Sequence, residues 1–393
     1  MAPGNAAQLV ADGQEALRGM RVDEAIAAFE GALRLEAENV AAHLGMYEAL
    51  QVKGDRARAL EHQKRALLQS RLFLDKPAPP GAPTVLLVAI PGDWQANVPL
   101  EFFYGSMPFG VLKLYAEGTL PEPRSLPAAD VVFNAVAHSD AAEATLRALA
   151  EWLARVGLPV VNDPARVLRL SRDGVARDFA DLPGALVPAV RRVERTALAF
   201  DPLVAGADPR SPALVRPIDS QAGNDFLRLD DPHQLSGYLA TVDAQAFFVA
   251  PFVDYRSADG LYRKYRIIFV EGIAYPCHLA ISPRWMVHYY NADNAEIAAF
   301  RQEEERWLAD IFRAFDGPRE RVLELIASRV GLDYFGIDCG ILPDGRVVLF
   351  EIDVAMIVHL GDPIEKYPYK HVYVPRIYRA VERMIESRAR GSR

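Results

Sequence analysis

Three carboxylates near the carboxyl end of the chain have the spacing expected of a metal site. Asp338 lies in one apolar segment, Glu351 and Asp353 lie in the next, and Asp344-Gly345 stands between the two segments. Both segments are rich in β-branched and aromatic residues, and Asp-Gly is a strong signal for a tight turn, so the sequence predicts a β-hairpin. Side chains alternate along a strand, which places Glu351 and Asp353 on one face.

A two-residue turn pairs Pro343 with Arg346 and therefore Asp338 with Glu351. Three carboxylates on one patch repel one another unless a cation or protons neutralise them, and hard oxygen ligands suit Mg²⁺. We therefore predict that Asp338, Glu351 and Asp353 are metal ligands. The alternative is the exposed face of an ordinary hairpin. A shift of register by one residue would move Asp338 to the opposite face and remove the site.

Cations occur in two earlier segments. Arg216 ends an apolar strand and precedes a loop of small residues that includes Ser220 and Gly223. Backbone N–H groups of such a loop can approach phosphate oxygens, and a guanidinium can hold them, although small-residue loops are also common without a ligand. Lys264 and Arg266 share one face of a later strand, where they are either solvated or paired with an anion such as a nucleotide phosphate.

The elements that must position these residues alternate between strand and helix. Apolar stretches at 84–90, 130–137 and 158–162 predict strands, and the apolar spacing at 141–155 predicts a helix. Strand–helix–strand alternation is typical of a parallel sheet, whose strand ends are the usual binding positions. The sequence therefore predicts an α/β fold.

The N-terminal part repeats itself. Residues 6–73 show a period of 34, in which Ala25 corresponds to Ala59 and Phe29 to Gln63. The period and the pattern of small and large residues resemble the tetratricopeptide repeat, a stacked helix–turn–helix. The resemblance implies a peptide or protein partner, or self-association, whereas the alternative is a plain helical bundle without a binding role.

Composition limits the class of protein. A chain of 393 residues is long enough for two or three domains, and a net charge of −8 argues against non-specific nucleic-acid binding. The sequence contains no run of about 18 uncharged apolar residues, so we expect no membrane span. The first residues do not have the pattern of a secretory signal. The two isolated cysteines favour a reducing compartment, so we expect a cytoplasmic location.

The order of elements over residues 84–385 resembles the ATP-grasp fold. That family's metal motif is an acid on one strand followed by Glu-x-Asn on the next, which Asp338, Glu351 and Asp353 match with Asp in place of Asn. The resemblance implies an ATP- and Mg²⁺-dependent carboxylate–amine ligase that works through an acyl-phosphate, with two Mg²⁺ ions and with amino acids or peptide-like molecules as substrates. Arg216 resembles a cation that touches the ATP phosphates, and Arg266 resembles an arginine near the acyl-phosphate.

Other positions depart from the family pattern. Gly174 stands where an Asp-Lys pair is usual, so that Arg172 or Arg177 would supply the missing cation. Lys264 stands where an acid for the ribose is common, and Asp254 or Asp259 would take that role. Two rival hypotheses stay open: a non-catalytic scaffold that binds a partner through its helical repeats, and a kinase on the same fold.

The predicted site has three parts. The catalytic residues are Lys264 and Arg266, and the metal ligands are Asp338, Glu351 and Asp353. The nucleotide-binding residues are Arg177, Arg216, Ser220, Gly223, Ala250, Phe252 and Asp254. His359, Lys366 and Lys370 are candidates for contact with the carboxylate or the acceptor, and His278 and His288 either line an acceptor pocket or are packed histidines.

The predicted domains follow the same order. They are tetratricopeptide-like repeats over 1–75, a proline-rich linker over 76–83, a first α/β domain over 84–162, a lid over 163–250 and a C-terminal catalytic subdomain over 251–393.

Overall fold

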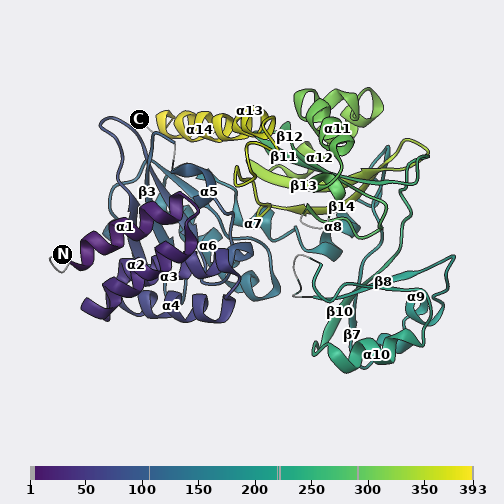
Figure 1. Cartoon of the computed structure of the whole chain (residues 1–393), viewed down its shortest axis with the longest axis horizontal. Helices are drawn as coiled ribbons and strands as arrows, with labels where there is room; N and C mark the ends of the chain where they lie inside the picture. The colour runs from purple at the N-terminus through teal and green to yellow at the C-terminus, as the bar shows by residue number, and fades with distance from the viewer. Residues whose placement is uncertain (1–4, 106, 219, 221–222, 290–291, 392–393) are drawn as a thin grey trace. The chain divides into compact units, whose positions relative to one another are not determined.

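The structure is a computed structural model that describes residues 5–105, 107–218, 220, 223–289 and 292–391 (Figure 1). The chain forms two compact units. The first unit comprises residues 1–137, 144–164 and 385–393, and the second comprises 138–143 and 165–384. None of the helices in the described ranges is both long enough and apolar enough to cross a membrane.

The first unit begins with four helices, drawn in purple in Figure 1. They are α1 (Ala6–Arg18), α2 (Val22–Leu35), α3 (Val40–Lys53) and α4 (Arg56–Gln69). α3 begins 34 residues after α1, and α4 begins 34 residues after α2, which is the period of the sequence repeat. Asn39 and Asp55 cap α3 and α4 by accepting hydrogen bonds from the N–H groups of Ala42 and Arg58.

The repeat pairs Phe29 with Gln63 for a structural reason. Phe29 is fully buried among the helices, where a Cβ on Gly45 would lie 2.3 Å from its ring. Gln63 instead accepts a hydrogen bond from the N–H of Gly92 at 2.9 Å, and Tyr47 donates to the carbonyl of the same glycine at 2.8 Å. The second helical pair therefore packs on the α/β part of the unit, so its central position is polar.

The α/β part of the first unit is a five-stranded sheet of order β1-β3-β2-β4-β5, parallel except for β1. Its strands and helices are β1 (Leu72–Lys76), β2 (Thr84–Ala89), β3 (Gly110–Tyr115), β4 (Val131–Asn134), β5 (Val160–Val161), α5 (Glu101–Tyr104) and α6 (Glu143–Val156). The strands predicted over 84–90, 130–137 and 158–162 correspond to β2, β4 and β5. Two strands were not predicted: β1 lies at the end of the range expected to be helical repeats, and β3 carries a buried lysine, Lys113.

The second unit contains a four-stranded antiparallel sheet of order β7-β10-β8-β9. Its elements are β7 (Arg191–Glu194), β8 (Ala213–Pro217), β9 (Leu227–Leu229), β10 (Ala246–Pro251), α9 (Pro202–Ala205) and α10 (Gln234–Thr241). One face of this sheet and the two helices enclose a small apolar core that includes Val215, Leu235 and Phe247.

The other sheet of the second unit has the order β12-β11-β13-β14-β6. Its strands are β6 (Ala185–Leu186), β11 (Tyr262–Val270), β12 (Ile273–Ser282), β13 (Tyr334–Ile341) and β14 (Val347–Asp353). The helices outside the sheet are α7 (Pro164–Val167), α8 (Arg172–Asp178), α11 (Ala298–Ala309), α12 (Pro318–Val330), α13 (Lys370–Tyr373) and α14 (Pro375–Arg390). Tyr265 packs edge-on against Trp307 at 5.1 Å and Phe315 at 5.2 Å, so aromatic residues cover its face of β11. Lys264 and Arg266 alternate with Tyr265 and lie on the opposite face.

The predicted β13–β14 hairpin forms, but its turn differs from the prediction. Arg346 pairs with Leu342 rather than with Pro343, which makes a three-residue turn in which Gly345 has φ +88°. This turn shifts the register by one residue. A bulge at Phe350 then shifts it back, so that Asp338 and Glu351 are opposite each other after all. The predicted pairing is confirmed, although the predicted two-residue turn is wrong.

Candidate active site

A row of charged side chains crosses three strands on one face of the β12–β6 sheet. Arg266 on β11 lies opposite Asp338 on β13, and Asp338 lies opposite Glu351 on β14. Directly opposite residues point to the same face, so the three side chains lie together. Lys264, two residues before Arg266, shares this face.

Asp338 is almost completely buried and is held by two cations. Its carboxylate accepts hydrogen bonds from Nε and Nη2 of Arg266 at 2.8 and 2.9 Å, and it forms an ion pair with Nζ of Lys264 at 2.8 Å. Burial by itself would raise the pKa of Asp338, but the charges of Arg266 and Lys264 outweigh burial and hold the pKa well below its usual value. Asp338 therefore anchors the two predicted catalytic cations.

Glu351 is paired with a cation from outside the sheet. Arg172, the first residue of α8, donates from Nη2 to Oε1 of Glu351. Ser171 caps this helix by accepting the N–H of Gly174 at 3.1 Å, which fixes where the helix begins. Burial opposes the ionisation of Glu351, yet the charge of Arg172 outweighs it and the pKa of Glu351 is lowered. The pair joins two elements that are distant in sequence.

Asp353 is the third predicted metal ligand. Its Oδ1 accepts the N–H of Ala355 at 3.0 Å, and burial together with the nearby charge of Glu351 raises its pKa to about 6. Within the described residues, no three or more His, Cys, Asp or Glu side chains are grouped closely enough to hold a metal ion. The predicted trio therefore shares a sheet face without forming a preassembled ligand set, because Asp338 and Glu351 are each directed at a cation.

Arg216 is the cation that distinguishes this site. Its Nε donates to Oγ of Ser220 at 3.2 Å, its Nη2 donates to the carbonyl of the same serine, and its guanidinium lies 5.5 Å from the centre of the Phe226 ring. Burial, and then the positive charge of Arg172, lower the pKa of Arg216 to about 10. Among the carboxylates that the structure describes, none forms an ion pair with Arg216. The guanidinium remains a half-buried cation that an anion would stabilise.

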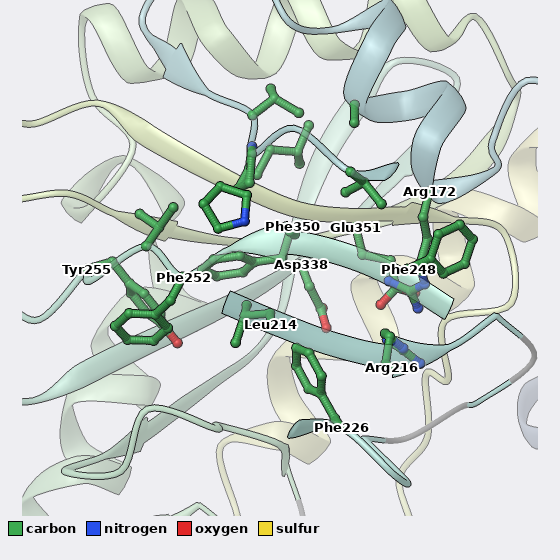
Figure 2. Close-up of a pocket in the computed structure, with 18 of the residues that line it drawn as sticks. Arg172, Leu214, Arg216, Phe226, Phe248, Phe252, Tyr255, Asp338, Phe350 and Glu351 are labelled. Atoms are coloured by element: carbon green, nitrogen blue, oxygen red, sulfur yellow. The ribbon is translucent and has the colours of Figure 1, made fainter. Parts of the chain in front are cut away.

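Five of these charged residues line a cavity of about 190 Å³, namely Arg172, Arg216, Lys264, Asp338 and Glu351, whereas Arg266 and Asp353 do not line it. Figure 2 shows Arg172, Arg216 and Glu351 at one end of the cavity, with Phe252 and Tyr255 away from them. The other walls are mostly apolar or aromatic and include Val175, Ala176, Val190, Leu214, Phe226, Phe248, Trp285, Leu349 and Phe350. The cavity thus joins an apolar compartment to an ionic one.

The predicted adenine-side residues divide into two groups. Ala250 and Phe252, at the end of β10, line the cavity as predicted. Asp254 does not line it, because its carboxylate is held by Arg256, whose Nε lies 3.0 Å from both carboxylate oxygens. Asp259, the alternative acid, is likewise bound by Arg263 at 2.8 Å. Neither acid reaches the cavity wall.

Of the two arginines predicted as alternatives, Arg172 lines the cavity and Arg177 does not. Arg177 is 72% exposed and donates to the adjacent Asp178 at 3.1 Å, whereas Arg172 lines the cavity. The two arginines are five residues apart on α8, which is about 140° around the helix axis, so they point to different sides. The prediction of Arg177 as a nucleotide-binding residue is therefore corrected.

The predicted phosphate loop is described only in part, because positions 219, 221 and 222 lie outside the described residues. Ser220 accepts hydrogen bonds from Arg216 at both its hydroxyl and its carbonyl oxygen. Gly223 has φ +77°, and a Cβ there would lie 2.5 Å from Nε2 of His288. Only glycine permits this backbone to lie against His288 without strain.

Sequence reasoning left out several cavity residues. Phe226, Tyr255 and Phe350 are aromatic residues in or beside strands, and a strand pattern does not distinguish cavity walls from a packed core. His288 lines the cavity, which agrees with one of the two interpretations of the aromatic segment around it. Burial, and then the charge of Lys264, lower the pKa of His288 to about 4, so its ring is neutral at neutral pH.

Comparisons with known proteins give structural likenesses without a sequence match. No family model and no curated protein matches the sequence. The chain is similar in structure to a D-alanine–D-alanine ligase from Bacillus anthracis complexed with ATP, at 12% identity and a TM-score of 0.47, covering 78% of this chain and 98% of that one. It is also similar to a RimK domain ATP-grasp protein from Sphaerobacter thermophilus, at 16% identity and a TM-score of 0.40, covering 75% and 99%.

A third likeness is to a D-cycloserine synthetase, at 14% identity and a TM-score of 0.42, covering 75% of this chain and 99% of that one. These identities and TM-scores do not assign the chain to a family.

Proposed function

We propose that this chain is an ATP-grasp ligase that uses ATP and Mg²⁺ to join a carboxylate to an amine. One observation carries the proposal: a single cavity has an apolar, aromatic end and an ionic end, and the ionic end holds a half-buried guanidinium, Arg216, that is without a described carboxylate partner. A nucleotide has the complementary character, with a flat apolar base at one end and phosphates at the other.

The apolar end fits a base better than a whole nucleotide. Ala250 and Phe252 line it, and Arg228 stacks on the outer side of Phe252 at 4.2 Å, which holds that ring in place. A volume of about 190 Å³ is below the range of roughly 300 to 1,000 Å³ typical of ligand pockets. We therefore expect the cavity walls to separate when ATP binds.

Two of the three predicted ligands fit a divalent cation: Glu351, which lines the cavity, and Asp353, two residues further along β14, which does not line it. Burial and the charge of Glu351 raise the pKa of Asp353 to about 6, so these two acids repel each other and a cation between them would relieve the repulsion. Asp338 fits less well, because Arg266 and Lys264 already occupy both of its oxygens. We propose that Glu351 and Asp353 hold Mg²⁺ together with phosphate oxygens, which is the usual protein share of a magnesium site.

The cations of the chain have separate roles in the reaction. Bound Mg²⁺ would neutralise charge on the phosphate oxygens. Arg216 binds the phosphate chain, while Lys264 and Arg266, fixed by Asp338, bind the transferring group and the substrate carboxylate. The carboxylate oxygen forms a bond to the γ-phosphorus as the bond to the β-phosphate oxygen breaks. The amine then displaces phosphate from the acyl carbon and loses a proton.

Calorimetric titration of the full chain with ATP, with and without Mg²⁺, tests nucleotide binding. We expect binding that requires Mg²⁺, and Arg216→Gln should weaken it by about tenfold or more, because a charged hydrogen bond to phosphate contributes on the order of 1.5–3 kcal/mol. Arg177→Gln is the matched control and should leave the affinity unchanged, since Arg177 is exposed outside the cavity. Binding that ignores Mg²⁺, or equal effects of the two variants, would contradict the proposal.

Release of ADP with paired carboxylates and amines tests the reaction. Phosphate release that needs both substrates supports a ligase, whereas ADP release that needs only a phosphoryl acceptor supports a kinase. One observation favours a non-catalytic scaffold: Asp338 and Glu351 are already paired with Lys264, Arg266 and Arg172. Absence of Mg²⁺-dependent ATP binding would select that alternative.

A further inference from the structure

His278 is a buried histidine whose two ring nitrogens have no hydrogen-bond partner in the described structure. The residue as a whole is only 6% exposed. The ring centre lies 4.8 Å from that of Tyr289, with the planes tilted by 40°, so the aromatic contact covers a ring face and leaves the nitrogens at the ring edge unpaired. Buried polar groups are nearly always paired, so an unpaired imidazole requires an explanation.

The position of His278 places it beside the proposed reaction site. His278 on β12 lies directly opposite Arg266 on β11, which extends the row to His278, Arg266, Asp338 and Glu351 across four neighbouring strands. Directly opposite residues share a face, so His278 lies on the face that carries Asp338 and Glu351. It is one strand beyond the arginine to which we assign the transferring group and the substrate carboxylate.

The charges around His278 determine whether a charged or an uncharged amine is favoured beside it. Burial, followed by the positive charges of Arg266, Lys370 and Lys264, keeps the pKa of His278 well below its usual value, against the opposing effect of Asp338. The imidazole is therefore neutral and offers one donor and one acceptor. The net effect of these neighbours disfavours a positive charge at this position, and it therefore favours an uncharged amine over a protonated one.

Lys370 contacts Tyr289, the aromatic residue that packs on His278. Its Nζ pairs with Asp362 at 3.1 Å and Glu304 at 3.5 Å, and it lies 4.2 Å from the centre of the Tyr289 ring. Tyr289 in turn packs edge-on against His359 at 5.8 Å. Tyr289 therefore packs on His278, and Lys370 and His359 contact Tyr289 in turn.

We propose that His278 binds the amine substrate, in its uncharged form, next to the phosphoryl site. This inference depends on the proposed ligase function and adds the residue that contacts the nucleophile. An imidazole nitrogen that accepts a hydrogen bond from an N–H of the amine leaves the lone pair of the amine nitrogen free to attack. The accepting nitrogen of His278 then gains a partner when the substrate binds.

Nuclear magnetic resonance of the full chain tests the proposal directly. The chain contains eight histidines, so ¹⁵N labelling of histidine gives a spectrum small enough to assign by substitution. The labelled chain, with Mg²⁺ and a non-hydrolysable ATP analogue, is titrated with the twenty L-amino acids, glycine amide and D-alanine as amine probes. We expect one class of amine to shift the ring resonances of His278 in a saturable way.

His278→Gln supplies the second measurement. It should weaken binding of that amine by at least about tenfold, which corresponds to leaving one buried partner unpaired, and should change the affinity for the ATP analogue by less than about twofold. His233→Gln, at an exposed histidine, is the matched control and should change neither. If His278→Gln does not fold, substitution of the other seven histidines assigns the spectrum, and the wild-type titration decides.

The outcomes separate this inference from the proposed function. If no amine shifts the His278 resonances, or if an amine that stimulates ADP release leaves them unchanged, the assignment of His278 is overturned. If an amine shifts them but no carboxylate gives ADP release, the ligase proposal fails while the amine site stands.

Discussion

Arg172 and Glu351 are 179 positions apart in the chain, and they form an ion pair at the ionic end of the cavity. Each group is about one-quarter exposed, so the pair is neither fully buried nor a simple surface contact. Arg172 occupies the carboxylate that we assign to Mg²⁺. The guanidinium and the metal ion therefore compete for the same oxygens.

Removing Arg172 should consequently strengthen the binding of Mg²⁺ alone. We expect Arg172→Gln to raise the affinity for Mg²⁺ without nucleotide by about fivefold, since a partly exposed ion pair contributes on the order of 1 kcal/mol. The same substitution should weaken ATP binding, because a cation beside the phosphates is lost. Calorimetric titration with MgCl₂ and with ATP measures both effects, and Arg177→Gln is the control. Weaker binding of Mg²⁺ by Arg172→Gln would contradict competition.

Asp338→Asn should destabilise the second unit strongly. The substitution leaves Lys264 and Arg266 beside a neutral amide, and removal of one partner from a buried ion pair typically costs about 3–5 kcal/mol. Urea and thermal denaturation followed by circular dichroism measure the loss. Asp344→Asn, at the exposed hairpin turn, changes the same chemical group and should leave the unfolding midpoint unchanged. Equal midpoints for the two variants would show that Asp338 does not anchor the cations.

His288 should make the stability of the fold fall in mild acid. Its folded pKa of about 4 lies below the ordinary histidine pKa of 6.5, so the unfolded state binds a proton first as pH decreases. Its contribution is fully present above pH 6.5 and is lost as pH falls towards 4. His288→Gln should therefore flatten the dependence of the free energy of unfolding on pH in that window. The exposed His233→Gln should keep the wild-type slope, and a wild-type slope in both variants would refute the assignment.

Gly45→Ala should destabilise the N-terminal helices. A Cβ at this position would lie 2.3 Å from the ring of Phe29, which is fully buried and has no free space to move into. Overpacking of this kind costs about 1–3 kcal/mol, although alanine is the better helix former. Gly237→Ala, in α10 with open space around its Cα, is the matched control and should be neutral or stabilising. Thermal denaturation separates the two, and a stable Gly45→Ala variant would mean that the helical pair is loosely packed.

Local patterns in the sequence were sufficient for several elements. The β13–β14 hairpin follows from its apolar segments and its Asp-Gly turn, and the four N-terminal helices follow the 34-residue period. The pairing of Asp338 with Glu351 was also predicted, but two unforeseen features produce it. The three-residue turn and the bulge at Phe350 shift the register in opposite directions and cancel.

Other features could not be predicted from local patterns. β1 was assigned to the helical repeats because its strand character depends on pairing with β3, and β3 was missed because Lys113 interrupts its apolar pattern. Asp254 is a plausible ribose ligand by its position in the sequence, yet Arg256, two residues later, holds its carboxylate at the surface.

The sequence by itself determined the N-terminal helices, the β13–β14 hairpin and which residues share a strand face, because these properties depend on local patterns in the sequence. Only the tertiary structure decided which charges are paired. Arg172 rather than Arg177 reaches Glu351, Asp338 is committed to two cations, and Arg216 has no described carboxylate partner. Ion pairing depends on distances of a few ångströms between groups far apart in the chain, and the packing of whole elements sets those distances.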